Sequence, residues 1–556
     1  MAEITGVGVS PGRAVGPLVR MPDPVAEPAM DSRLPDGADP AAESERITTA
    51  AATVRAGLEE RAGKVHGDGK AVLEATALMA ADPTLVAAAQ HKVGAGMASG
   101  RAVWEAAGDV ADMLTSLGGY MAERARDVAD VRDRIVAELA GLPAPGVPDR
   151  AEPYVLAAHD LAPADTATLD PVTCLALVTA EGGPTSHTAI LARALGLPAV
   201  VAARGILGIA EGTVVLVDGS AGTVRTEPTA EEVEQVRVVA ARERTFDGQG
   251  RTADGRPVQL LANVGDPKGI AAAVEANAEG VGLFRTEFCF LGHTEAPSVD
   301  EQVTAYRAVL SAFPGKKVVV RTLDAGADKP LPFLNPADEA NPALGVRGLR
   351  TVTRSEVVLT DQLAAIATAA VAEQAEVWVM APMVATAAET ADFVARCTAA
   401  GLERAGVMVE VPGAALTASH ILETAHFASI GTNDLGQYTM AADRMLGELA
   451  QLNDPWQPAV LRLVQLTCAA GEKRDRPVGV CGEAAADPAL ACVLVGLGVS
   501  SLSMTPRSIP DVADVLLATS HDDCVRLGEL AVNAASATAA RASVRAELPV
   551  LAELGL

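Results

Sequence analysis

The chain has 556 residues, of which 49% are hydrophobic, and a formal net charge of −27. This length predicts two to four domains, and the acidic charge argues against nucleic acid or an anionic membrane as a general partner. The seven cysteines form no CxxC pair, which indicates a reducing cytoplasm and argues against a disulfide framework or a structural zinc site. We expect no signal peptide and no membrane span.

The N-terminal segment gives no sign of nucleotide binding. Residues 1–22 are predicted to form a short strand and a turn, and residues 23–40, rich in Pro and Asp, a loop. Gly6, Gly8 and Gly12 do not satisfy GxGxxG, and the sequence contains no P-loop motif.

Residues 41–140 are predicted to be helical and to form an Ala-rich bundle. Asp82 before Pro83 is an expected N-cap followed by proline at the first helical position. Residues 123–134 mix both charges densely. They indicate either a solvated face with i,i+4 pairs or a docking surface.

Residues 153–225 alternate between short strands and helices, which predicts a compact β/α domain. Within it, residues 182–193 carry glycine, proline and small hydroxyl residues and then enter a helix. His187 is therefore expected at a helix N-terminus, where backbone N–H groups and the helix dipole favour an anion. Because neutral imidazole is a usable nucleophile near pH 7, His187 is predicted to accept a phosphoryl group. The alternative is a hydrogen-bonded histidine in a turn.

Thr229 and the acidic residues after it predict a linker helix over 228–245, joining two halves of the protein. The second half repeats a unit of apolar strand, polar loop and helix. Eight such units predict a (β/α)₈ barrel, whose active site lies at the carboxyl ends of the strands. The expected strands are 258–262, 280–284, 318–321, 377–380, 406–409, 428–430, 478–480 and 501–504.

Charged residues follow several of these strands. Arg285, Arg321 and Arg444 are predicted to converge on a small polyanion, because guanidinium groups pair bidentately with phosphate or carboxylate. Glu410 and Asp434 end consecutive strands and, with water and substrate oxygens, suit Mg²⁺. The alternatives are surface ion pairs for the arginines and acids bonded to arginines for the carboxylates.

Two further residues complete the predicted site. Asn433 can hydrogen-bond the same ligand as Asp434. Cys481 lies between glycines at a strand end, and a mostly protonated thiol there can donate a proton. The default for a cysteine is a small buried hydrophobic residue.

The motifs that carry this chemistry resemble, in the same order, those of enzyme I, the phosphoenolpyruvate–protein phosphotransferase of the bacterial sugar phosphotransferase system. The resemblance covers essentially the whole chain. It rests on residues 182–188, 279–287, 321–324, 341–347, 430–435 and 481–483.

The resemblance implies a relay. His187 would take the phosphoryl group from phosphoenolpyruvate, release pyruvate, and pass the group to a histidine of the carrier HPr. Glu410 and Asp434 would ligate Mg²⁺, and Cys481 would protonate the enolate carbon. The residues that would bind substrate are Arg285, Arg321, Asn433, Asp434 and Arg444.

The resemblance also implies the fold, an α/β multidomain protein that forms a cytoplasmic homodimer. Residues 1–22 and 145–227 would form a swivelling phosphohistidine domain, and residues 23–144 an inserted helical domain that binds HPr. Residues 228–250 would be the linker helix, and residues 251–556 the phosphoenolpyruvate-binding, dimerising TIM barrel. Pro184 and Ala327 depart from many relatives and affect the expected loop geometry rather than the reaction class.

Three alternative interpretations compete with this one. Pyruvate phosphate dikinase or phosphoenolpyruvate synthase would need an ATP-binding domain, for which the chain is too short. A nitrogen-regulatory paralogue usually adds an N-terminal sensory domain. A non-catalytic scaffold is disfavoured by the intact His187, Cys481, metal-type acids and arginines.

Overall fold

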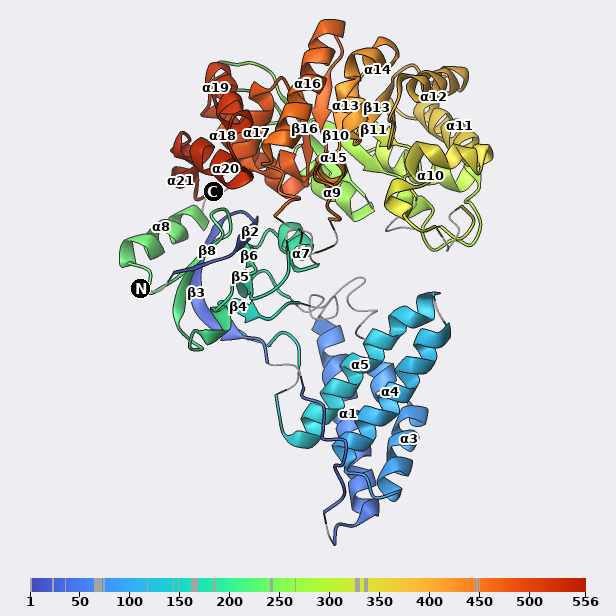
Figure 1. Cartoon of the computed structure of the whole chain (residues 1–556), viewed down its shortest axis with the longest axis vertical. Helices are drawn as coiled ribbons and strands as arrows, with labels where there is room; N and C mark the ends of the chain where they lie inside the picture. The colour runs from blue at the N-terminus through green and yellow to red at the C-terminus, as the bar shows by residue number, and fades with distance from the viewer. Residues whose placement is uncertain are drawn as a thin grey trace. The chain divides into compact units, whose positions relative to one another are not determined.

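The chain divides into two compact units, Met1–Glu234 and Gln235–Leu556 (Figure 1). The computed structural model describes residues 3–556 except 23–24, 36, 65–72, 74–75, 118, 144, 149, 162–168, 184–186, 241–243, 266, 326–330, 335–338, 445, 447–448 and 450. The predicted α/β multidomain fold is confirmed. The division falls within helix α8 (Ala230–Ala240), inside the segment predicted as a linker helix. Thr229 caps this helix, because its Oγ1 accepts a hydrogen bond from the Glu232 N–H at 3.3 Å.

An eight-stranded sheet forms the β part of the first unit, in the order β1-β8-β7-β3-β4-β5-β6-β2. Strands β3 to β6 pair in parallel, and the remaining neighbours are antiparallel. Helix α7 (His187–Leu195) follows β5 along the chain. The strands are β1 (Glu3–Thr5), β2 (Val7–Ser10), β3 (Arg13–Arg20), β4 (Tyr154–Ala158), β5 (Cys174–Thr179), β6 (Ala199–Val201), β7 (Val214–Asp218) and β8 (Thr223–Thr226).

The expectation of one short strand in residues 1–22 is wrong, since the structure has three. Glycines obscure the strand pattern there, yet they are what let the backbones approach closely. A Cβ at Gly8 would lie 2.2 Å from the Gly219 carbonyl oxygen, and a Cβ at Gly6 would lie 2.4 Å from that of Val201.

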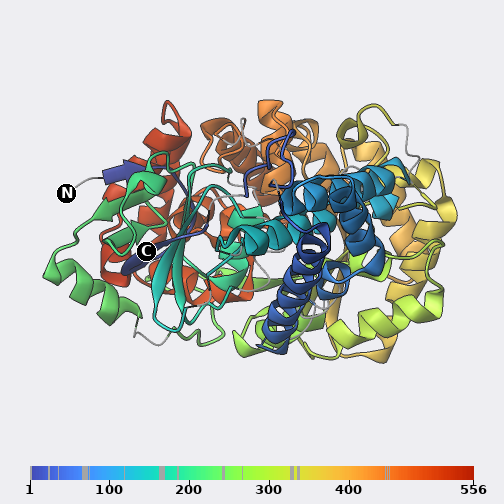
Figure 2. The same cartoon turned by 90° about the horizontal axis from the view of Figure 1, so that it is seen from below.

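The helices between β3 and β4 form a bundle, and those with described bounds are α1 (Pro40–Lys64), α3 (Pro83–Gly94), α4 (Ser99–Leu117) and α5 (Gly119–Ala140). Figures 1 and 2 show them side by side, in blue to cyan, around a core that includes Ile47, Val93 and Ile135. The Asp82 side chain accepts a hydrogen bond from the Thr84 N–H at 2.7 Å, which confirms the predicted cap.

The charged segment on α5 contains one of the predicted i,i+4 pairs, since Arg134 Nε donates to Asp130 Oδ2 at 2.8 Å. The Arg132 guanidinium lies 3.5 Å from the centroid of the Trp104 ring. The local ion pairs are therefore present, but none of residues 127–134 is fully exposed and Arg134 is 7% exposed, so a solvated face is wrong for this part of the segment. The side chains of residues 123–126 lie outside the described residues.

The second unit is a closed barrel of eight parallel strands, as predicted. Alternation along β11 separates two environments: Val318 and Val320 pack outward against the helices, whereas Val319 lies inside the barrel. The strands are β9 (Gln259–Val264), β10 (Gly280–Arg285), β11 (Lys317–Arg321), β12 (Glu376–Ala381), β13 (Ala405–Val409), β14 (Ala428–Ile430), β15 (Val478–Val480) and β16 (Ser501–Met504).

The α-helices of this unit are α9 (Pro267–Glu275), α10 (Val299–Leu310), α11 (Glu356–Ala372), α12 (Ala387–Ala399), α13 (Pro412–Leu416), α14 (Ala418–Thr424), α15 (Thr432–Met440), α16 (Pro458–Arg474), α17 (Pro488–Gly496), α18 (Ile509–Leu517), α19 (His521–Val532), α20 (Ala537–Ala546) and α21 (Val550–Leu554). Among the described residues, no helix is long and apolar enough to cross a membrane.

Thr386→Ala should destabilise the barrel by about 1 kcal/mol, because Thr386 caps α12 in a reciprocal capping box with Glu389. Urea unfolding followed by tryptophan fluorescence measures this. The matched control is Thr398→Ala on the same helix, whose hydroxyl only bonds back to the Val394 carbonyl and should change stability by less than about 0.5 kcal/mol. Equal losses in the two variants would contradict the capping role.

Candidate active site

His187 is the first residue of α7, so the predicted helix N-terminus is confirmed at the level of the backbone. Its side chain and residues 184–186, including Pro184, lie outside the described residues. The next residue anchors the helix start: Thr188 Oγ1 donates to Asp160 Oδ1 at 2.8 Å and accepts from the Leu161 N–H at 3.3 Å. These bonds fix the start of α7 against the segment that follows β4.

Arg321 ends β11 inside the barrel and is 8% exposed. Its Nη2 donates to Glu287 Oε1 at 2.6 Å, and its Nη1 lies 3.2 Å from Asp324 Oδ2. Within the described part of the chain, neither Arg321 Nε nor Glu287 Oε2 has a hydrogen-bond partner. An unsatisfied donor on a buried guanidinium is costly, so Arg321 keeps a donor available for a ligand.

Arg347 joins two acids at the same end of the barrel and is 3% exposed. Its Nη2 lies 2.9 Å from Asp324 Oδ2, and its Nη1 lies 3.2 Å from Asp434 Oδ1 and 3.3 Å from the Tyr438 hydroxyl. Burial alone would raise the pKa of Asp324, but Arg321 and Arg347 outweigh it and hold that pKa below its usual value. Asp324 and its two arginines therefore form a buried charged network.

Glu410 follows β13 and is 2% exposed. Burial, together with the nearby charges of Asp434 and Asp324, raises its pKa to about 8. Its Oε2 accepts a hydrogen bond from the Met383 N–H at 2.8 Å. Met383 has a φ of 59°, an uncommon conformation for a residue with a side chain. Three carboxylates thus crowd one dry site, and a cation there would relieve their repulsion.

Cys481 follows β15 and is 2% exposed. Its Sγ lies 3.7 Å from the Ile430 carbonyl oxygen and is hydrogen-bonded by the Ser429 hydroxyl. Burial is the main cause that raises the pKa of Cys481 to about 11, so the group is a thiol at neutral pH. This is the protonation state that a proton donor needs.

The other predicted residues lie around this network. Arg285 is exposed at the end of β10, paired in register with Arg321, and its charge lowers the pKa of Cys481. Asn433 Oδ1 accepts from the Glu483 N–H at 3.2 Å. The Arg444 backbone N–H donates to Gln437 at 3.0 Å, and the charge of Arg444 lowers the pKa of Asp324. The carboxyl end of the barrel therefore gathers the seven residues that the sequence predicted for it.

The sequence pattern did not predict a role for three further residues of this site, Glu287, Arg347 and Tyr438. Arg347 belongs to the quoted motif 341–347, and Glu287 stands two residues after Arg285. Their positions in these motifs indicated a functional role, but strand periodicity does not predict where the side chain of a loop residue points. The motif position Ala327 lies outside the described residues.

Comparison with known proteins gives three family matches. They are the PEP-utilising enzyme N-terminal region over residues 5–124, the mobile domain over 150–222 and the PEP-binding domain over 240–520. A phosphoenolpyruvate-protein phosphotransferase from Streptomyces coelicolor is 51% identical over 98% of this chain and 99% of its own length. One from Haloferax volcanii is 38% identical over 96% and 97%. A multiphosphoryl transfer protein from Rhodobacter capsulatus is 39% identical over 97% of this chain and 66% of its own length.

Arg347→Met should destabilise the barrel by about 3–5 kcal/mol, because it leaves Asp324 and Asp434 buried without their shared partner. Adding Asp324→Asn should recover part of the loss, with a coupling of at least about 1 kcal/mol in a double-mutant cycle measured by urea unfolding.

The matched control for this cycle is Arg354→Met, which breaks a more exposed pair with Glu339 and should cost much less. Strict additivity of Arg347→Met and Asp324→Asn would contradict the network.

Proposed function

We propose that this chain, which belongs to the phosphoenolpyruvate–protein phosphotransferase family, carries its phosphoryl group on His187. The chain is a phosphotransferase that acts through a phosphohistidine intermediate and uses phosphoenolpyruvate as donor. His187 is supported as the acceptor by its place at the N-terminus of α7, where backbone N–H groups and the helix dipole stabilise an anionic group.

The carboxyl end of the barrel, which we call the barrel mouth, is proposed as the phosphoenolpyruvate site. The observation that carries this proposal is the buried network of Arg321, Arg347, Asp324 and Asp434 beside Glu410. Guanidinium groups held in a dry site bind phosphate and carboxylate strongly. Arg285, Arg444 and Asn433 surround the network and would complete the contacts to the two anionic ends of the substrate.

Mg²⁺ fits the carboxylates of this site, which offer only oxygen ligands. Among the described residues, no group of three or more His, Cys, Asp and Glu side chains could hold a metal. Mg²⁺ is commonly held by one or two carboxylates together with substrate phosphate and water. We assign Glu410 and Asp434 as its ligands. Burial first, and then the charges of Asp434 and Asp324, raise the pKa of Glu410, so a cation between these acids would favour its ionised form. When bound, Mg²⁺ would offset charge on the phosphoryl oxygens.

Cys481 is proposed as the proton donor. An imidazole nitrogen of His187 attacks phosphorus, the bond between phosphorus and the enol oxygen breaks, and the enolate of pyruvate is left at the barrel mouth. The Cys481 S–H proton then passes to the methylene carbon, which completes pyruvate, and the thiolate recovers a proton from water. The thiol is in place for this because its pKa of about 11 keeps it protonated.

The acceptor, the oligomer and the location are the remaining proposals. We propose that phospho-His187 passes its group to a histidine of an HPr-like phosphocarrier docked on the helical bundle. Swivelling of the phosphohistidine domain would give His187 access to both sites in turn. Dimerisation through the barrel and a cytoplasmic location stay predictions.

Labelled phosphoenolpyruvate with Mg²⁺ and no ATP should give an acid-labile, base-stable phosphoprotein, and His187→Ala should abolish the label. The control is His91→Ala, an exposed histidine on α3, which should label like the wild type. EDTA should stop the labelling of both the wild type and His91→Ala, because it removes Mg²⁺. If His187→Ala is labelled to the wild-type extent, the proposed acceptor is wrong.

Cys481→Ser should slow pyruvate formation about 100-fold or more, because a serine hydroxyl is a far weaker acid than a thiol. Labelling of this variant by a phosphorylated carrier should persist, because that step needs no proton transfer to carbon. The control is Cys289→Ser, a half-buried cysteine outside the proposed mechanism. Unchanged turnover in Cys481→Ser, measured by coupled detection of pyruvate, would remove this residue from the mechanism.

A further inference from the structure

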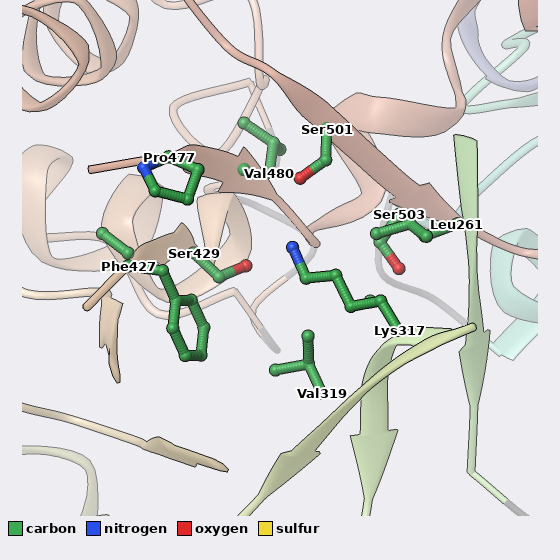
Figure 3. A pocket seen from close by; sticks show the side chains of 12 residues that line it. Leu261, Lys317, Val319, Phe427, Ser429, Pro477, Val480, Ser501 and Ser503 are labelled. Carbon is green, nitrogen blue, oxygen red and sulfur yellow. The ribbon is translucent and has the colours of Figure 1, made fainter. Parts of the chain in front are cut away.

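A small cavity lies inside the barrel at the amino-terminal ends of the strands (Figure 3). Lys317 begins β11 and shares the inner face of that strand with Val319 and Arg321, because side chains alternate along a strand. Arg321 therefore points into the barrel at the proposed active-site end, and Lys317 points into it at the opposite end. Ser429, Ser501, Ser503 and Phe427 also line the cavity.

The Lys317 ammonium group has no salt-bridge partner among the described residues, although the charge of Glu376 acts on it. Its Nζ lies 4.0 Å from the centroid of the Trp378 ring and 5.9 Å from that of Phe427. Among the described residues, none gives it a hydrogen bond or an ion pair. Burial lowers the pKa of Lys317 to about 8, and Glu376 opposes this only in part. The group is thus a partly desolvated cation that forms no direct ion pair with a carboxylate among the described residues.

Ser501 supplies a second polar group aimed into the same space, as Figure 3 shows. The described residues give its hydroxyl no hydrogen-bond partner. Gly479 leaves room for that hydroxyl, since a Cβ there would lie 2.4 Å from Ser501 Oγ. The other hydroxyls are engaged: Ser503 Oγ donates to Asn263 Oδ1 at 2.6 Å, and the Ser429 hydroxyl bonds to Cys481. The donors left for a ligand are therefore Lys317 Nζ and Ser501 Oγ.

We propose that this cavity binds one small inorganic anion, the size of chloride, between Lys317 Nζ and Ser501 Oγ. The cavity of about 10 Å³ has room for roughly one water-sized centre, which excludes phosphate and larger oxyanions. Of the described residues that line it, none carries a carboxylate, so an anion gains from the cation without repulsion from the lining. The ion links β11 to β16 across the barrel end, and it stabilises the barrel independently of the proposed active site at the other end.

The test is thermal unfolding of the full chain in sodium chloride, with sodium gluconate replacing it at constant ionic strength. Gluconate is too large for the cavity, so a specific site gives a midpoint that rises with chloride and then saturates. The midpoint of Lys317→Met should not depend on chloride, since this apolar side chain of similar length removes the charge. Arg404→Gln is the matched control, because Arg404 lies 5.7 Å from the Trp378 ring but does not line the cavity, and it should respond like the wild type.

The proposal is wrong if the unfolding midpoint of the wild type does not change with chloride, which is the result expected of a cavity that holds only water. It is also wrong if the midpoint of Lys317→Met rises with chloride as that of the wild type does. If Lys317→Met does not fold, the same chloride titration of Ser501→Ala tests the proposal instead. Loss of its hydrogen bond should raise the half-saturating chloride concentration about tenfold, and an unchanged concentration overturns the proposal. Crystals soaked in bromide should show one anomalous peak between Lys317 Nζ and Ser501 Oγ, and a peak elsewhere only would count against the site.

Discussion

The barrel mouth depends on one constraint, which is that buried charges must be paired. Arg321, Asp324, Arg347 and Asp434 form a continuous run of alternating charge, and each is at most 8% exposed. Removing any one of these charges leaves at least one desolvated neighbour with a partner fewer. The network therefore ties Asp324 and Arg347, which lie in loops, to the end of β11 and to α15. If substrate binds here as proposed, the network holds the guanidinium groups in place beforehand, so that little has to reorganise during the reaction.

Strand β11 shows how one short segment serves both ends of a barrel. Its inner face carries Lys317, Val319 and Arg321 in succession, and its outer valines pack against the helices. At the carboxyl end the cation is matched by Glu287 and Asp324. At the amino end no carboxylate lines the cavity. The same alternation thus places Arg321, which is paired with carboxylates, at the proposed substrate site. It places Lys317, which forms no ion pair among the described residues, at the proposed anion site.

The first unit holds the proposed acceptor, His187, by different interactions. The His187 backbone lies at a helix start that Thr188 and Asp160 anchor, and close glycine contacts join the strands of the sheet nearby. The barrel relies on buried ion pairs, whereas this unit relies on backbone approach and one hydroxyl–carboxylate bond.

The sequence by itself determined the barrel and most of its polar strand ends. The expected strands 428–430, 478–480 and 501–504 have the same bounds in the structure, because apolar runs and turn residues are local signals. The carboxyl ends of parallel strands must also meet at one rim, so Arg321, Glu410 and Asp434 could be grouped from sequence order alone. The three glycine-rich strands in residues 1–22 were not predicted, because their pairing depends on contacts with residues that are distant in the sequence.

Only the tertiary structure decided how these side chains are partnered. Arg347, rather than a predicted residue, joins Asp434 to Asp324, and Glu287 accepts from Arg321. The raised pKa of Glu410 and the unmatched charge of Lys317 likewise follow from burial and neighbours. Desolvation and pairing are set by distances between segments remote in sequence, and local periodicity carries no information about those distances.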